Sequence, residues 1–325
     1  MTIEEKHLIR LMGKMLLFAL VGVVFLGPIC FLSRQGDRQS LTAPVFHFGK
    51  DITILVAGDS HAEASVNPSL LPHSVNIARS CENYFYTYYK LCHFLNSNSQ
   101  VSTVVLAFSW HNFARDYQEP ILFGDVGRNV DSYFPLLDQP GKDLIKSWKS
   151  SYMVPWARYT FGLPLQVYRD HLLQRQLLGL PLRREDFDFF GGYESLKTSN
   201  IDQENINKKL RLYYSGLCNS DFDMSKYMIE YLHKILKLCS QRKIKVVLFN
   251  SPVHQIYRDG VPNRAVTSLD SLQLKLRSQF DNVIYIDCSN LQLPSENYYD
   301  GDHVNSRGST ILTKYLADEL GKLIF

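Results

Sequence analysis

The chain has 325 residues, 45% of them hydrophobic and 21% charged, and its net charge is +3 at pH 7. This composition is typical of a folded protein and excludes an intrinsically disordered one. The small net charge and the lack of a dense run of Lys and Arg also argue against a nucleic-acid partner.

The first predicted element is an apolar segment at residues 15–32, MLLFALVGVVFLGPICFL. An uncharged run of this length is long enough for a membrane-spanning helix. A cleaved signal peptide, the alternative, has a shorter apolar core followed by small residues, whereas this run leads into SRQGDRQS. We therefore predict a cytoplasmic N-terminus at residues 1–14, an uncleaved transmembrane anchor at 15–32 and a polar tether at 33–49.

The charges that flank this segment predict its orientation. Lys6, Arg10 and Lys14 precede it, and Arg34 and Arg38 follow it. The positive-inside rule therefore favours a cytoplasmic N-terminus by three charges to two. On this basis the rest of the chain lies outside the cytoplasm.

Five short apolar runs rich in β-branched residues follow the tether. They lie at residues 52–57, 74–78, 101–108, 244–249 and 282–287. Because successive residues are apolar, these runs predict strands buried on both faces, as in a parallel sheet.

Between and after these strands, apolar residues recur three or four positions apart, which is the spacing of an amphipathic helix. The pattern covers residues 224–238, 269–280 and 311–323. Strands that alternate with helices predict a three-layer α/β/α domain over residues 50–325, with right-handed crossovers. We expect the flavodoxin-like strand order 2-1-3-4-5.

One long segment interrupts this alternation. Residues 113–216 separate the third strand from its returning helix. An unstructured loop of about a hundred residues is improbable inside a compact domain, so we predict a partly helical insertion over the edge of the sheet.

Polar residues follow each predicted strand, at the edge where open parallel sheets bind their ligands. A serine, a histidine and a carboxylate on one edge form the set that nucleophilic acyl transfer needs. The serine hydroxyl is a weak nucleophile alone, the histidine takes its proton, and the carboxylate orients the imidazole. Asp59 to His61 follow the first strand, Arg79 to Asn83 the second and Trp110 to Asn112 the third. Asn250 to His254 follow the fourth strand, and Asp300 to His303 follow the fifth.

The sequence GDSH at 58–61, with DGDH at 300–303, resembles the SGNH/GDSL hydrolase superfamily. That family takes its nucleophile from the first motif and an Asp and a His from the second. The resemblance implies that Ser60 is the nucleophile, His303 the general base and Asp300 the orienting carboxylate. It also implies an SGNH-type fold and chemistry that requires no cofactor.

The resemblance further implies an oxyanion hole. The main-chain N–H of Ser60 and the side chain of Asn112, at the position of the third-block asparagine, are the expected donors. The usual second-block glycine is not evident, and Ser80 is its stand-in; SWHN also replaces the usual G-x-N-D pattern. The resemblance covers about residues 50–116 and 221–325 and leaves out the insertion.

GDSH in place of GDSL, together with the predicted anchor, resembles a narrower group of bacterial extracytoplasmic proteins. These include the alginate O-acetylation proteins and the D-alanyl transfer protein of teichoic acid modification. The resemblance implies an esterase or O-acyltransferase that acts on a cell-envelope glycan or acyl donor through an acyl-serine intermediate. It also implies a membrane-bound O-acyltransferase as partner, and a catalytic domain on the outer side of the bacterial cytoplasmic membrane.

Several alternatives stay open. Ser60 can instead be a turn serine that caps the next helix, and the protein a noncatalytic subunit that binds glycan or docks on the acyltransferase. Asp302 can replace Asp300 as the orienting carboxylate. We predict no metal, because the candidate ligands match no known metal motif in their spacing, although their types suit a divalent ion. Those candidates are Asp59, His61, Asp302 and His303.

A last group of residues is expected to line the substrate groove, because its members lie beside the predicted site. The group consists of His61, Trp110, His254 and Tyr299.

Overall fold

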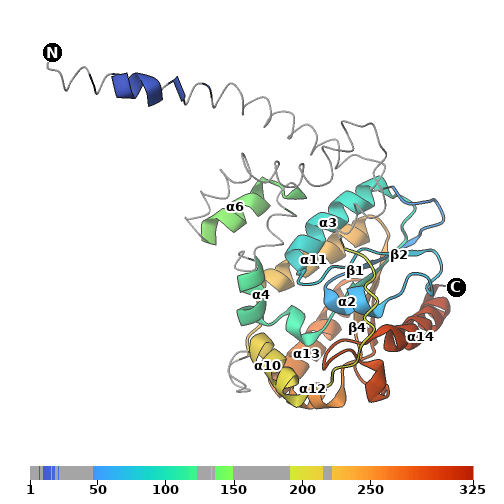
Figure 1. The fold of residues 1–325 in the computed structure, drawn as a ribbon. Helices are drawn as coiled ribbons and strands as arrows, with labels where there is room; N and C mark the ends of the chain where they lie inside the picture. The colour runs from blue at the N-terminus through green and yellow to red at the C-terminus, as the bar shows by residue number, and fades with distance from the viewer. Residues whose placement is uncertain are drawn as a thin grey trace. The chain divides into compact units, whose positions relative to one another are not determined.

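The computed structural model divides the chain into two compact units, residues 1–45 with 149–186 and residues 46–148 with 187–325. The second unit contains the sheet and the helices that cover it (Figure 1). The residues that the structure describes are 47–122, 133, 136–148, 191–214 and 222–324, with 7, 10–15, 17, 18 and 21 near the N-terminus.

Most of the predicted anchor, residues 15–32, lies outside the described residues, as do residues 33–46 of the predicted tether. The described positions of the anchor are helical and expose apolar side chains, among them Phe18, which is 82% exposed. In the described part of the chain, no helix combines the length and apolar character needed to cross a membrane. The anchor and its orientation therefore stay predictions.

The centre of the second unit is a parallel sheet of five strands in the order β2-β1-β3-β4-β5. This confirms the predicted number, direction and order of the strands. The strands are β1 Ile54–Ala57, β2 Ser74–Asn76, β3 Thr103–Ala107, β4 Lys245–Asn250 and β5 Val283–Asp287.

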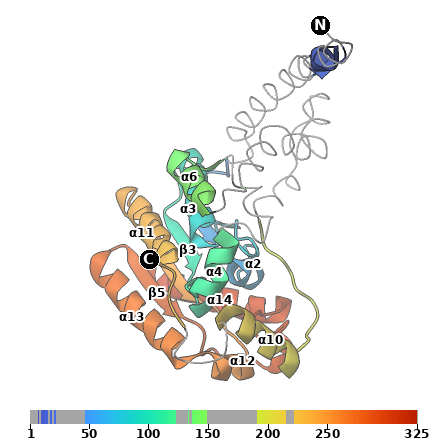
Figure 2. The same ribbon diagram turned by 90° about the vertical axis from the view of Figure 1, so that its left-hand side faces the viewer.

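Helices cover both faces of this sheet, as predicted (Figure 2). The helices α2 Ser60–Ser65 and α14 Ser306–Ile324 pack on one face, where Leu312 and Leu316 share a core cluster with residues of β1, β3 and β4. The other face carries α3 Tyr84–Ser97, α11 Lys226–Gln241 and α13 Asn263–Gln279. The chain between these elements brings the loops that follow the strands to one edge.

In the described parts of the predicted insertion, the longer elements of secondary structure are helices. They include α4 Arg115–Leu122, α6 Gln139–Trp148 and α10 Gln203–Tyr214. The helix α10 packs against α4 and against α12 Gln255–Gly260, which follows β4. The insertion therefore contributes a helix next to the loops at the ligand-binding edge.

The segment 191–200, which leads into α10, binds two of these loops and the helix α2 through main-chain hydrogen bonds. Gly192 N–H donates to the carbonyl of Ala78 after β2, at 2.9 Å. Glu194 N–H donates to the carbonyl of Glu63 in α2 at 3.1 Å, and Asn200 N–H donates to that of Tyr299 at 2.7 Å. The returning end of the insertion is thus attached to the same edge as the candidate site.

Candidate active site

Ser60 lies at the first residue of α2, directly after a tight turn at the end of β1. Gly58 forms this turn with φ = +127°, and a Cβ atom there would lie 2.7 Å from the Cβ of Ala107, so only glycine fits. Asp59 caps the helix, because its Oδ1 accepts the N–H of His61 at 3.0 Å. As the first helical residue, Ser60 has a main-chain N–H with no acceptor inside the helix.

The loop between β5 and α14 presents the candidate base. Asn305 fixes this loop at its end, since its side-chain amide donates to the carbonyl of Tyr298 at 3.2 Å and its Oδ1 accepts the N–H of Arg307 at 3.0 Å. Inside the loop, the main-chain N–H of His303 donates to Oδ1 of Asp300 at 3.0 Å. Asp300 and His303 are thereby held on the same side of one turn.

Three of the predicted site residues meet in a single hydrogen-bonded chain. Ser60 Oγ lies 2.8 Å from Nε2 of His303, although the two residues are 243 positions apart in the sequence. Nδ1 of the same imidazole lies 3.0 Å from Oδ1 of Asp300. Both distances are within hydrogen-bond range, so the hydroxyl and a carboxylate occupy opposite ends of the ring.

A second carboxylate reaches the same imidazole. Oδ1 of Asp302 lies 3.3 Å from Nδ1 of His303, and the side chain of Asp302 is 0% exposed, against 17% for Asp300. Oδ2 of Asp302 accepts the hydroxyl of Tyr213 at 3.0 Å. The open alternative of Asp302 as orienting group therefore has direct geometric support, while Asp300 is the nearer of the two.

These carboxylates control the charge of the imidazole. Burial alone would lower the pKa of His303, but Asp302 and Asp300 favour the protonated ring and raise the pKa to about 10. Burial would raise the pKa of Asp302, yet the neighbouring His303, His61 and Lys209 hold it well below its usual range. These contacts favour an ionised Asp302 and an imidazole that keeps its proton to higher pH than a free histidine.

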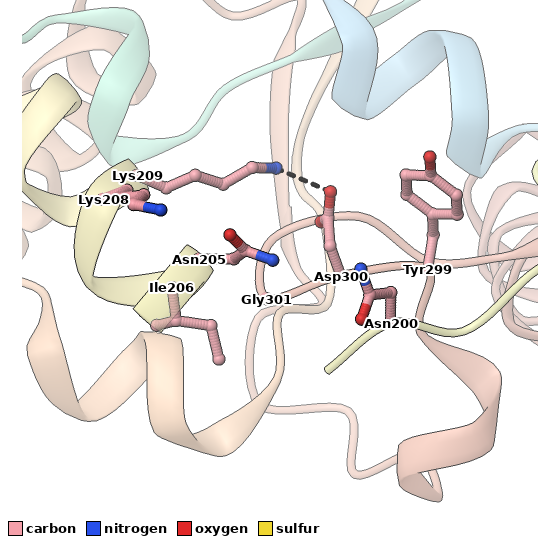
Figure 3. A pocket seen from close by; sticks show the side chains of 8 residues that line it. All are labelled: Asn200, Asn205, Ile206, Lys208, Lys209, Tyr299, Asp300 and Gly301. Atoms are coloured by element: carbon pink, nitrogen blue, oxygen red, sulfur yellow. Dashed lines mark hydrogen bonds and ion pairs between the residues drawn. The ribbon is translucent and has the colours of Figure 1, made fainter. Parts of the chain in front are cut away.

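Two further residues of this cluster, Lys209 and Tyr213 of α10, are not predicted from the sequence. Lys209 extends from the helix toward Asp300, with its Nζ 2.7 Å from Oδ2 (Figure 3). The same ammonium contacts Oδ1 of Asp302 and lies 3.1 Å from Nδ1 of His303. Their spacing of four residues places Lys209 and Tyr213 on one helical face, but nothing in the sequence indicates where that face lies.

The predicted oxyanion donors are partly engaged elsewhere. Asn112 lies in a short 3-10 helix, Trp110–Asn112, and its Nδ2 donates to Oδ2 of Asp59 at 2.7 Å. Its Oδ1 accepts the N–H of Ser109 at 2.8 Å. The same Nδ2 lies 3.4 Å from Nε2 of His111, and Asn112 is 4% exposed, so its amide is used largely inside the protein.

Ser80 does not take the place of the missing glycine. Its main-chain N–H donates to Oε2 of Glu63 at 2.9 Å, and its hydroxyl contacts the same oxygen. Burial raises the pKa of Glu63 to about 7, and these two donors from Ser80 act in the opposite direction. The N–H that we expected at the oxyanion therefore satisfies a half-buried carboxyl group.

The candidate metal ligands divide into two groups. His61, Asp302 and His303 offer ligand atoms within 4.8 Å of one another. Asp59 is held apart from them, because its Oδ2 binds His111 Nε2 at 2.6 Å as well as Asn112. An ammonium already contacts Asp302, so these groups fit an internal ion-pair network better than a vacant metal site.

Of the four predicted groove residues, three are buried. His61 lies beneath His303, with ring centroids 5.0 Å apart, and Trp110 and His254 are 6% and 8% exposed. Burial, reinforced by the neighbouring His111, lowers the pKa of His61 to about 4, so this ring is neutral. These three side chains offer little surface to a ligand.

Tyr299, the fourth, does line a pocket, which has a volume of about 280 Å³ and adjoins the candidate carboxylate (Figure 3). The amide side chains of Asn200 and Asn205 face the same space. Its lining consists of Asn200, Asn205, Ile206, Lys208, Lys209, Tyr299, Asp300 and Gly301.

Comparisons with known proteins give distant matches. A family model without a functional description matches residues 204–325, less than half of the chain, and no curated protein matches. A proposed acylhydrolase from Bacteroides fragilis is similar with a TM-score of 0.38 and 8% identity, over 86% of this chain and 91% of that one. A GDSL-like lipase from Bacteroides thetaiotaomicron is similar with a TM-score of 0.36 and 9% identity, over 85% of this chain and 90% of that one. Likenesses this remote assign no function.

Proposed function

We propose that this protein is a serine-dependent esterase or O-acyltransferase that acts on acyl esters of a cell-envelope polysaccharide. The observation that carries the proposal is the 2.8 Å contact between Ser60 Oγ and His303 Nε2, with a carboxylate 3.0 Å from the other ring nitrogen. This arrangement has the parts that acyl transfer through a serine requires: a nucleophile, a base and a group that orients the base.

In the first half of the reaction, Ser60 Oγ attacks the carbonyl carbon of the ester while its proton passes to Nε2 of His303. The main-chain N–H of Ser60 and a side-chain N–H of Asn112 donate to the oxyanion of the tetrahedral intermediate. When the intermediate collapses, His303 gives its proton to the leaving alcohol, and acyl-Ser60 remains.

In the second half, a hydroxyl group enters and the steps run in reverse. His303 accepts a proton from water or from a sugar hydroxyl, whose oxygen attacks the acyl carbonyl. When this second tetrahedral intermediate collapses, His303 gives the proton to Oγ of Ser60, which leaves as a free hydroxyl. Water gives hydrolysis, and a sugar hydroxyl gives transfer. The predicted partner of the transfer reaction is a membrane-bound O-acyltransferase that supplies the acyl group outside the cytoplasm.

The Ser60→Ala variant tests this proposal. We expect turnover of p-nitrophenyl acetate to fall by about a thousandfold or more, because the variant lacks the hydroxyl that forms the acyl intermediate. Circular dichroism checks that the variant is folded. Ser69→Ala, at an exposed serine beyond the end of α2, is the matched control and should keep wild-type activity. Wild-type turnover by purified Ser60→Ala would refute the proposal.

A second candidate is a noncatalytic subunit that binds glycan or docks on the acyltransferase. It is favoured by the oxyanion region, where Ser80 donates to Glu63 and Asn112 to Asp59. A fluorophosphonate probe separates the two candidates, because it reacts only with an activated serine. Mass spectrometry that finds the label on Ser60 supports the enzyme, whereas no label on a protein that still binds glycan supports the subunit.

A further inference from the structure

The helix α10 packs tightly on the loop that carries the candidate carboxylate and base. A Cβ atom at Gly301 would lie 2.6 Å from Cγ1 of Ile206. The side chain of Ile206 can therefore approach the loop closely because residue 301 is a glycine. Lys209, one turn further along α10, then lies within reach of both aspartates of the loop. The side chain of Lys209 is a quarter exposed, so water screens its charge only in part.

Each element packed around His303 brings its own groups to the ring. The loop itself supplies the carboxylates of Asp300 and Asp302, and α10 supplies the ammonium of Lys209. From α2 come the hydroxyl of Ser60 and the ring of His61, which is neutral. The ionic surroundings of the imidazole are therefore two negative charges and one positive charge.

We propose that Lys209 is a positioning residue for His303, which holds Asp300 and Asp302 behind the imidazole and offsets one of their two negative charges. This inference rests on the proposed function, in which His303 is the general base. It makes the insertion part of the active site, because Lys209 belongs to neither of the two motifs at the ends of the domain.

The charge of Lys209 has a predictable effect on the base. Two uncompensated carboxylates would stabilise the imidazolium further, whereas a nearby ammonium destabilises it and lowers the pKa of His303. When Lys209 loses its charge, the ring should therefore keep its proton to higher pH. Because only the neutral ring can accept the proton of Ser60, the rise of kcat/KM with pH should move in the same direction.

The experiment compares Lys209→Met, Lys209→Arg and Arg211→Met in the full-length protein. The titration of the His303 ring is followed by NMR with labelled histidine, with His303→Gln for assignment. We expect the titration midpoint in Lys209→Met to rise by about one pH unit. At pH 8 kcat/KM should then fall about tenfold, in proportion to the neutral fraction of the ring.

Lys209→Arg keeps the positive charge, so its His303 titration midpoint and its kcat/KM at pH 8 should both stay near the wild-type values. Arg211→Met is the matched control. Arg211 is an exposed cation on the same helix and is not among the residues that line the pocket, so this variant should leave both values unchanged. If Lys209→Met does not fold, Lys209→Gln, which also lacks the charge, gives the same measurement.

An unchanged or lower His303 midpoint in the folded neutral variants would overturn the inference, even if activity fell, because Lys209 would then be only structural. The NMR titration does not depend on turnover. A raised midpoint in Lys209→Met, together with wild-type activity in Ser60→Ala, would therefore refute the proposed function and leave the charge effect of Lys209 in place.

Discussion

The imidazole of His303 lies between a hydroxyl and two carboxylates, and the two carboxylates differ in their surroundings. Asp300 accepts both the main-chain N–H and the ring N–H of His303, so it fixes the orientation of the ring. Asp302 is fully buried and receives the hydroxyl of Tyr213. Because buried charges are screened least, Asp302 has the stronger influence on the charge state of the ring. Asp300 has the stronger influence on the position of the ring, because it makes the two hydrogen bonds to His303.

This difference predicts how Asp302→Asn changes the pH dependence. His303 is a base only when neutral, and with its pKa raised to about 10 the neutral fraction grows as the pH rises through the neutral range. Asparagine keeps the shape of the side chain but removes a charge that favours the imidazolium. The pKa of His303 should therefore fall, and the rise of kcat/KM should move to lower pH by about one unit or more.

Initial rates on p-nitrophenyl acetate between pH 6 and 10 measure this change. Asp300→Asn serves as the comparison, because loss of the orienting contact should reduce kcat at every pH. If the profile of Asp302→Asn coincides with that of the wild type, Asp302 does not set the charge of His303.

The sequence was sufficient to place Ser60, Asp300 and His303 at one edge, because the carboxyl ends of parallel strands converge there. It was not sufficient for Ser80 and Asn112. Whether their N–H groups face a ligand or an internal carboxylate depends on how Glu63 and Asp59 are packed. Such choices between hydrogen-bond partners arise from three-dimensional packing and leave no periodic signal in the sequence.

At the scale of elements, the apolar periodicity of the sequence predicted the strands and helices, but it did not predict the residues at which they end. The predicted strand at 74–78 ends at Asn76, whose side chain donates to the carbonyls of Ala62 and Val66 and ties the strand to α2. Main-chain hydrogen bonds to β1 continue past it, since Ile77 N–H donates to the carbonyl of Val56 at 2.8 Å. The position of α10 could not be predicted, because no topological rule places a helix inside an insertion. In the structure it packs against α4 and α12, and the fit between Ile206 and Gly301 is one part of its packing.

That fit predicts a coupling between the two residues. Gly301→Ala should reduce stability by about 1–3 kcal/mol, because the new methyl group overlaps Ile206. It should also lower kcat, since α10 carries Lys209 away from the aspartates as it moves. In Gly301→Ala/Ile206→Ala the overlap is removed, so the double variant should lose less stability than the sum of the two single variants.

Urea unfolding of the three variants measures the free energies of unfolding, and a double-mutant cycle gives the coupling. Gly321→Ala, at a glycine of α14 with no atom within 4 Å of the added methyl group, is the matched control and should not be destabilised. Strictly additive free energies would show that α10 does not bear on the loop at Gly301.

At the scale of the whole molecule, the candidate site is assembled from both ends of the sheet domain and from the insertion. Ser60 comes from the start of the domain, Asp300 and His303 from its end, and Lys209 from α10.

A second feature at this scale is the N-terminal segment, whose described apolar side chains are exposed, including Leu11, Met15 and Phe18. Large exposed apolar side chains are stabilised when they leave water, which the predicted anchor would achieve in a bilayer.

If residues 15–32 span the membrane, the full-length protein should sediment with membranes and resist extraction by high salt and by carbonate at pH 11. Replacing Val23 and Val24 with lysine should release it, because each charge near the middle of a membrane helix costs about 3 kcal/mol. The three cationic residues before the span and two after it favour an external domain. Alkaline phosphatase fused after residue 49 should therefore be active, since that enzyme matures only outside the cytoplasm, where disulfides form. A full-length protein that stays in the soluble fraction would contradict the anchor. An inactive fusion that is bound to the membrane would contradict only the orientation, and the acyl-transfer chemistry would then have to take place on the cytoplasmic side.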